Sequence, residues 1–160
     1  MTRQETCDAL TAGGIAYELT EHAAVFNMQE LENVRLPYPD RDAKNLFVRD
    51  DKKQRYYLIT VRGDKRVDLK AFRERFGTRK LSFASPEELM EIMRLIPGAV
   101  TPLGLLNDGE RKVTLYLDAA FLDGLIGVHP NDNTATVWLK AEDLVRLIRA
   151  HGNQVITADI

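Results

Sequence analysis

The first part of the chain alternates short apolar blocks with polar turns, which predicts helices and strands of modest length. Residues 2–12 are expected to form an opening helix, because Thr2 can cap the first turn and Glu5 can complete a capping box. Positions 15–20 alternate between apolar and polar side chains, as a strand does. Residues 27–34 predict a short helix.

A hairpin and a further helix are expected next. Strands are predicted at residues 45–49 and 55–61, and the polar turn at residues 50–53 favours an antiparallel pairing between them. Residues 68–76 predict a helix, which Gly77 is expected to end.

The clearest helix start in the sequence is Ser85-Pro86-Glu87-Glu88. Ser85 can cap the helix, proline suits the first helical position, and Glu88 can complete a capping box. Apolar residues at helical spacing predict a buried face that extends to Ile96, with Pro97-Gly98 ending the helix.

The last third of the chain predicts strands at residues 113–117, 125–128, 134–139 and 154–157, a helical turn at 119–124 and a helix at 141–150. Hairpins interspersed with helices indicate an α+β fold with a mixed, mainly antiparallel sheet and surrounding helices. Crossover connections could add parallel pairs, so the strand order stays open. The length of 160 residues, without a repeat or linker, predicts a single domain over residues 1–160.

The composition argues against several classes of partner and of functional site. The net charge of −2, from 22 basic and 24 acidic residues, argues against a general nucleic-acid coat and against DNA as a partner. No apolar run is long enough to span a membrane, and the N-terminus does not resemble a signal peptide, so we expect a cytoplasmic protein. Cys7 is the only cysteine and the three histidines lie far apart, which argues against zinc but leaves a carboxylate site open. The sequence has no Walker loop and no Gly-x-Gly-x-x-Gly motif, and we expect no metal and no cofactor.

Three local features could carry chemistry, and each also has an ordinary structural interpretation. Lys44 begins an otherwise apolar strand, where a solvated lysine is common. Residues 97–104 are either a plain connection or a rigid loop that offers backbone N–H groups to a ligand. Residues 127–133 are typical of a hairpin loop, but His129 at the strand end could orient a substrate or a water.

Together these features resemble the YbaK/ProX family of freestanding aminoacyl-tRNA deacylases, which is similar to the editing insertion domain of bacterial prolyl-tRNA synthetase. Ala43-Lys44-Asn45-Leu46 matches the family's essential lysine, Gly98-Ala99-Val100-Thr101-Pro102 its Gly-x-x-x-Pro loop, and Gly127-Val128-His129-Pro130 its Gly-x-His segment. The resemblance extends over nearly the whole chain. Among the branches of the family, the chain looks most like the deacylase that clears alanine from proline tRNA.

The resemblance implies a partly barrel-like sheet and an enzyme that hydrolyses the ester of a mischarged tRNA, without a cofactor or metal. It implies Lys44, Gly98 and His129 as catalytic residues and Asn45, Thr101 and Pro102 as substrate-binding residues.

The expected partner is the acceptor end of a mischarged tRNA, with prolyl-tRNA synthetase as a further partner. Arg49, Arg79 and Lys80 are candidate tRNA contacts, although solvated surface cations are the ordinary interpretation. Two alternatives stay open: a deacylase for a tRNA that carries serine or cysteine, and a non-catalytic module that binds tRNA or protein.

Overall fold

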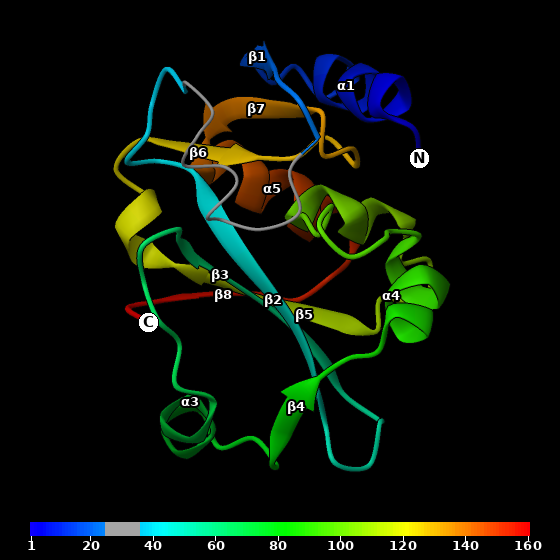
Figure 1. The fold of residues 1–160 in the computed structure, drawn as a ribbon, viewed down its shortest axis with the longest axis vertical. Helices are drawn as coiled ribbons and strands as arrows, with labels where there is room; N and C mark the ends of the chain where they lie inside the picture. Colours follow the sequence, from blue (N-terminus) through cyan, green and yellow to red (C-terminus); the bar gives the residue numbers. More distant parts are fainter. Residues whose placement is uncertain (25–35) are drawn as a thin grey trace.

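A computed structural model describes residues 1–24 and 36–160 (Figure 1). The helix predicted at residues 27–34 lies outside this part of the chain. The helices are α1 (Arg3–Ala12), α3 (Leu69–Phe76), α4 (Pro86–Met93) and α5 (Ala141–His151), with 3₁₀ turns η1 (Pro102–Asn107) and η2 (Ala119–Phe121). The strands are β1 (Tyr17–Glu21), β2 (Ala43–Asp50), β3 (Tyr56–Arg62), β4 (Leu81–Phe83), β5 (Val113–Asp118), β6 (Leu125–Val128), β7 (Ala135–Lys140) and β8 (Val155–Ala158).

The strands form two sheets. A five-stranded sheet has the order β4-β2-β3-β5-β8, antiparallel from β4 to β3 and parallel from β3 to β8. A three-stranded antiparallel sheet has the order β1-β7-β6. The predicted α+β class with a mixed, mainly antiparallel arrangement is confirmed, and the parallel pairs settle the strand order that the sequence left open. Within the described residues the sheets do not close into a barrel, so the expected barrel-like character is limited to the way they face each other.

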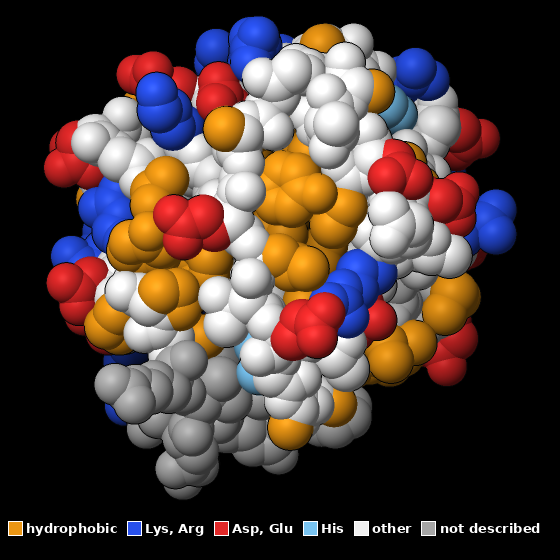
Figure 2. All heavy atoms as spheres, turned by 90° about the horizontal axis from the view of Figure 1, so that it is seen from above, with side chains coloured by type: hydrophobic (Ala, Val, Ile, Leu, Met, Phe, Trp, Pro, Cys, Tyr) orange, Lys and Arg blue, Asp and Glu red, His pale blue; other side chains and the backbone are white. Residues whose placement is uncertain are grey.

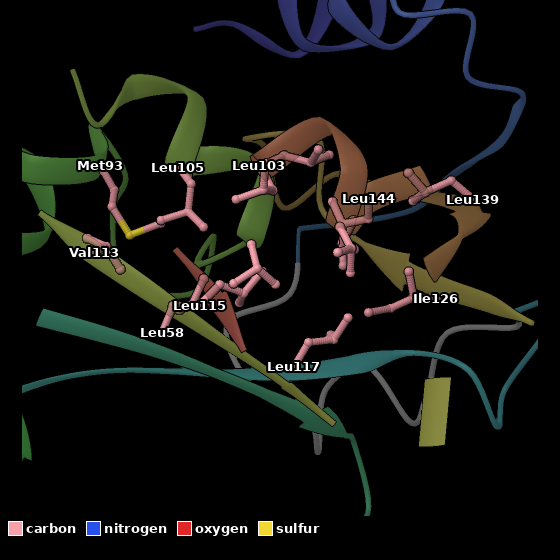
Figure 3. Packing of buried hydrophobic residues seen from close by; sticks show 14 of the residues in the cluster. Leu58, Met93, Leu103, Leu105, Val113, Leu115, Leu117, Ile126, Leu139 and Leu144 are labelled. Atoms are coloured by element: carbon pink, nitrogen blue, oxygen red, sulfur yellow. The ribbon is translucent and has the colours of Figure 1, made fainter. Parts of the chain in front are cut away.

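The main core lies between the two sheets and is closed by α5 and η1. Figure 3 shows Leu58, Leu115 and Leu117 of the larger sheet facing Leu103 and Leu144, with Ile126 and Leu139 of the smaller sheet alongside. The opposite face of the larger sheet carries a second cluster, which α3 covers with Phe72. The central strands β3 and β5 are therefore buried on both faces and form a rigid base for the loops at the edges of the sheet.

Local signals account for most helix boundaries. The capping boxes at Thr2 and at Ser85 are both present, each with the glutamate three residues on. The predicted extent of α4 was too long, because the helix ends at Met93 and Arg94 takes a left-handed conformation with φ 58°. Leu95 then turns back into the core, whereas Ile96 is 50% exposed instead of lying on a buried face.

Two short elements were missed by the sequence analysis. Strand β4 has only three residues, and its pairing with β2 is set by tertiary contacts rather than by an alternating pattern. The turn η1 begins at Pro102, where Thr101 supplies a side-chain cap that also occurs in ordinary loops.

Close packing at Gly127 joins the two sheets. Gly127 pairs with Trp138 across β6 and β7, and a Cβ at this position would lie 2.3 Å from the Trp138 ring. The Gly127 N–H donates to the Arg41 carbonyl at 2.8 Å, and an isolated parallel bridge links Gly127 to Asp42. The backbone of Gly127 therefore holds β6 beside the start of β2, and the absence of its side chain leaves room for the Trp138 ring.

We predict that Gly127→Ala lowers the free energy of unfolding by about 1–3 kcal/mol, the usual cost of forcing a methyl group into a packed core. The matched control is Gly109→Ala, because a Cβ at Gly109 meets no atom within 4 Å. Urea unfolding of both variants measures the difference. Equal loss of stability in the two variants would show that the Trp138 contact does not constrain this position.

Candidate functional site

Asn45 anchors the loop at residues 98–101 to the start of β2. Its Nδ2 donates to the Val100 carbonyl at 3.3 Å, and its Oδ1 accepts from the Thr60 hydroxyl at 2.7 Å. Asn45 and Thr60 are direct cross-strand partners, so both side chains lie on the same face of the sheet. That face points toward the main core, and the loop sits over its edge.

The other end of the loop is fixed by Thr101, which is fully buried. Its hydroxyl donates to the His129 carbonyl at 2.6 Å and accepts from the Leu103 N–H at 3.3 Å. Pro102 is buried behind it at the first position of η1. The Thr101 contact therefore places His129, at the end of β6, against the loop at residues 98–101. The sequence singled out both segments but gave no contact between them.

The loop between these anchors presents backbone donors. Gly98 has φ 89°, in the left-handed region that glycine adopts at little cost. The Ala99 N–H is used within the loop, where it donates to the Ile96 carbonyl at 3.1 Å. In the described part of the chain, the N–H groups of Gly98, Val100 and Thr101 have no hydrogen-bond partner. Unpaired backbone N–H groups are the type of donor that stabilises an oxyanion.

His129 lies at the end of β6 with a defined tautomer. Its Nδ1 lies 2.9 Å from the Ala135 carbonyl, which can only accept, so Nδ1 carries the proton and Nε2 keeps a lone pair. Burial lowers the pKa of His129, and the neighbouring His22 lowers it further, against the opposing effect of the hydrogen bond to Ala135. The lowered pKa favours the neutral ring, whose Nε2 has a lone pair available for a hydrogen bond.

His22 lies beside the candidate site residue His129, although nothing in the sequence placed the two together. Its ring lies edge-on to that of His129, with centroids 6.1 Å apart, and its Nε2 lies 2.9 Å from the Thr136 hydroxyl. No spacing in the sequence signals this contact, because it depends on the pairing of β1 with β7. The His22 backbone extends that pairing, since its N–H donates to the Thr134 carbonyl at 2.9 Å.

Lys44 projects from the opposite face of β2. Side chains alternate along a strand, and Leu46 and Val48 on the Lys44 side belong to the second cluster, whereas Phe47 belongs to the main core. The Lys44 ammonium donates to the Lys65 carbonyl. The structure thus places Lys44 next to Asn45 in the chain but does not bring its ammonium against the loop or His129.

Two of the candidate tRNA-binding cations are already engaged. Arg49 contacts Glu88 through Nε at 3.2 Å, and both side chains are largely buried. Arg79 makes two contacts to Asp51, at 2.6 and 3.1 Å. Lys80 is exposed, and its ammonium has no partner among the residues that the structure describes.

Residues 1–24 and 36–160 contain no cluster of three His, Cys, Asp or Glu residues that could hold a metal ion. The same residues contain no helix that is long and apolar enough to cross a membrane. Cys7 is a buried free thiol that packs in the main core.

Comparison with known proteins identifies the family. A family model described as the aminoacyl-tRNA editing domain matches residues 22–147. The prolyl-tRNA editing protein ProX of Acetoanaerobium sticklandii is 41% identical over 140 residues, which cover 87% of this chain and 85% of that protein. The prolyl-tRNA synthetase associated domain-containing protein 1 of Mus musculus is 34% identical over 159 residues, or 96% of this chain and 94% of that protein.

A solved structure agrees with the fold. It is described as a candidate trans-editing enzyme for prolyl-tRNA synthetase and superimposes with a TM-score of 0.70 over 98% of this chain and 94% of that chain, at 24% identity. The chain belongs to the aminoacyl-tRNA editing domain family. The resemblance drawn from the three motifs is confirmed, and the enzyme class is that of an aminoacyl-tRNA deacylase.

The Glu88 carboxylate links helix α4 to the larger sheet. It accepts from the Tyr56 hydroxyl at 2.7 Å, the Ser85 N–H at 2.9 Å and the Arg49 guanidinium. Burial raises the pKa of Glu88, but these hydrogen bonds outweigh it and hold the pKa to about 2. The carboxylate thereby ties α4 to β2 and β3.

We predict that this network makes stability fall in acid. Because the folded-state pKa of Glu88 is depressed, its contribution is present above pH 4.5 and is lost as the pH falls toward about 2. At about 1.4 kcal/mol per pKa unit, the loss is on the order of 3 kcal/mol. Urea unfolding at several pH values should show Glu88→Gln less stable than wild type at pH 7 and nearly equal near pH 2.

The matched control is Glu87→Gln, in the same helical turn but exposed. This variant should keep the pH dependence of the wild type. The network would be excluded as its source if Glu88→Gln kept that dependence too.

Proposed function

We propose that this chain removes alanine from mischarged proline tRNA by hydrolysing the ester at the terminal ribose. The observation that carries the proposal is the loop at residues 98–102, whose free N–H groups are held between Asn45 and His129. The relative in A. sticklandii, named a prolyl-tRNA editing protein, supports proline tRNA as the substrate.

An ester of this kind needs little chemical assistance beyond a positioned water and support for the developing oxyanion. We assign the oxyanion to the N–H groups of Gly98, Val100 and Thr101. His129, neutral and with a free lone pair on Nε2, accepts a hydrogen bond from the attacking water or from a ribose hydroxyl. Asn45, Thr101 and Pro102 hold the loop in the geometry that this requires.

Lys44 has a separate role in the proposal. Its ammonium lies on the other face of β2, beside the segment that carries Lys65. A cation there suits a phosphate or ribose oxygen of the terminal nucleotide rather than the ester carbonyl. The substrate would then wrap around the start of β2, with the ester on one side and the terminal phosphate on the other.

The three cations proposed from the sequence as tRNA contacts differ in whether they must first break an ion pair within the protein. Lys80 is free to meet a phosphate, whereas Arg79 would have to share or leave Asp51, and Arg49 would have to leave Glu88. Prolyl-tRNA synthetase, whose name appears in the description of the mouse relative, is the further partner that we propose. Hydrolysis of mischarged tRNA would take place in the cytoplasm.

Alanine is proposed because of a size sieve. A synthetase pocket built for proline rejects the smaller alanine by only about 1–3 kcal/mol for each missing group. A second pocket that admits a methyl group and excludes a ring completes the discrimination. This chain would supply that pocket in trans.

The test compares deacylation rates of alanyl and prolyl esters on proline tRNA, at one enzyme and one salt concentration. A clash of about 3 kcal/mol with the proline ring predicts a rate ratio of about one hundred or more. Correctly charged alanine tRNA serves as the control for recognition of the tRNA.

Equal rates for the alanyl and prolyl esters would contradict the sieve. Faster hydrolysis of a seryl or cysteinyl ester would assign the chain to another mischarged tRNA. Binding of tRNA without hydrolysis of any ester would leave a binding module instead of an enzyme.

A further inference from the structure

Positive charge is concentrated in one segment of an acidic chain. Residues 62–80 contain eight Lys and Arg residues against three Asp and Glu residues, a net charge of +5, whereas the whole chain has a net charge of −2. The remaining residues are therefore clearly acidic. The overall balance conceals a local surface of the kind that attracts polyanions.

Several of these cations are neutralised within the protein. Lys65 pairs with the buried Asp118 carboxylate, and Arg62 lies 3.6 Å from Asp64. Arg79 is paired with Asp51.

Four other cations in the segment are exposed, and their side chains have no hydrogen-bond or ion-pair partner in the part of the chain that the structure describes. These four residues, Arg66, Lys70, Arg73 and Lys80, are called here the cationic stripe. Unpaired exposed cations can meet a ligand without first breaking an internal contact.

Helix α3, which carries Lys70 and Arg73 of the cationic stripe, lies on the same side of the larger sheet as Lys44. Leu46 and Val48 share a face of β2 with Lys44, and this face packs against Phe72 of α3. In Figure 1 the segment after β3 descends along the molecule to α3. Lys44 contacts this segment through the Lys65 carbonyl, so the stripe leads away from Lys44.

Two other parts of the surface differ in charge from this segment. The first turns of α4 and α5 carry acidic residues: Glu87 and Glu88 in α4, and Glu142 and Asp143 in α5. The view from above in Figure 2, taken from the end away from α3, shows cations interspersed with carboxylates around a central group of hydrophobic side chains. Neither the starts of these helices nor the face in Figure 2 offers an extended anion a continuous run of unpaired cations.

We propose that the cationic stripe binds the phosphate backbone of the tRNA acceptor stem. The inference rests on the proposed function, which places the terminal nucleotide at Lys44. Proteins bind duplex RNA mainly through phosphates and 2′-hydroxyls, because its deep major groove is closed to side chains. The stem would leave the site along α3, and the three residues Arg66, Lys70 and Arg73 would fix its direction.

The test uses a triple charge reversal, Arg66→Glu/Lys70→Glu/Arg73→Glu. A matched control reverses three exposed cations outside the segment, Arg94→Glu/Lys112→Glu/Lys140→Glu, and so changes the net charge equally. Both variants are assayed on mischarged full-length tRNA and on a short aminoacylated oligonucleotide that ends in the same nucleotides but lacks the stem. Thermal unfolding shows whether each variant remains folded.

The proposal predicts that the stripe variant raises the KM for full-length tRNA by about tenfold or more at moderate salt, because three phosphate contacts are lost. Each lost contact should also lower the slope of binding against salt concentration by about one unit. The variant's kcat, and its kcat/KM on the short substrate, should stay near the wild-type values. A smaller dependence of KM on salt should accompany the change. The control variant should retain the wild-type KM.

An unchanged KM for full-length tRNA in the stripe variant would overturn the proposal, as would an equal loss on the short substrate or in the control variant. Each of these results can be measured only if the wild-type protein hydrolyses the ester. If the wild type hydrolyses no ester, the proposed function itself has failed, so the two failures are distinguishable.

Discussion

The hydrogen bond from the buried Thr101 hydroxyl to the His129 carbonyl is the contact on which the candidate site depends. A buried hydroxyl that loses its partner costs about 1–3 kcal/mol, so the bond is strongly favoured once the core has formed. It joins the start of η1 to the loop after β6, two segments that are remote in sequence. With Asn45 holding the Val100 carbonyl, it leaves the loop between them with little freedom.

The packing beneath this contact explains why the three sequence motifs occur together. Gly127 leaves room for the Trp138 ring, and its backbone bridges β6 to Asp42 at the start of β2, so its role is structural. Gly98 allows a left-handed turn in the loop whose N–H groups at Gly98, Val100 and Thr101 are unpaired within the described residues. The two glycines therefore act in different ways, one by close packing and the other by backbone conformation, although both belong to motifs that resemble those of the same family.

Local signals made much of the fold predictable. The caps at Thr2 and Ser85 act within one helical turn, so they could be read from the sequence, and the hairpin of β2 and β3 follows from its polar turn. The end of α4 could not be predicted, because Leu95 leaves the helix to fill the core. For the candidate site, the sequence indicated a set of residues but not the contacts between them. The contact of His22 with His129, and the pairing of Arg49 with Glu88, arise from tertiary packing that no spacing encodes.

The central claim is that the N–H groups of the loop at residues 98–102 receive the ester. NMR spectra of the ¹⁵N-labelled protein, titrated with alanine joined by an amide to 3′-amino-3′-deoxyadenosine, test it most directly, because this analogue cannot be hydrolysed. We predict the largest amide shifts at Gly98, Val100 and Thr101, together with a change at Nε2 of His129. Shifts confined to another surface, such as the groove between Leu122 and Arg149, would contradict the claim.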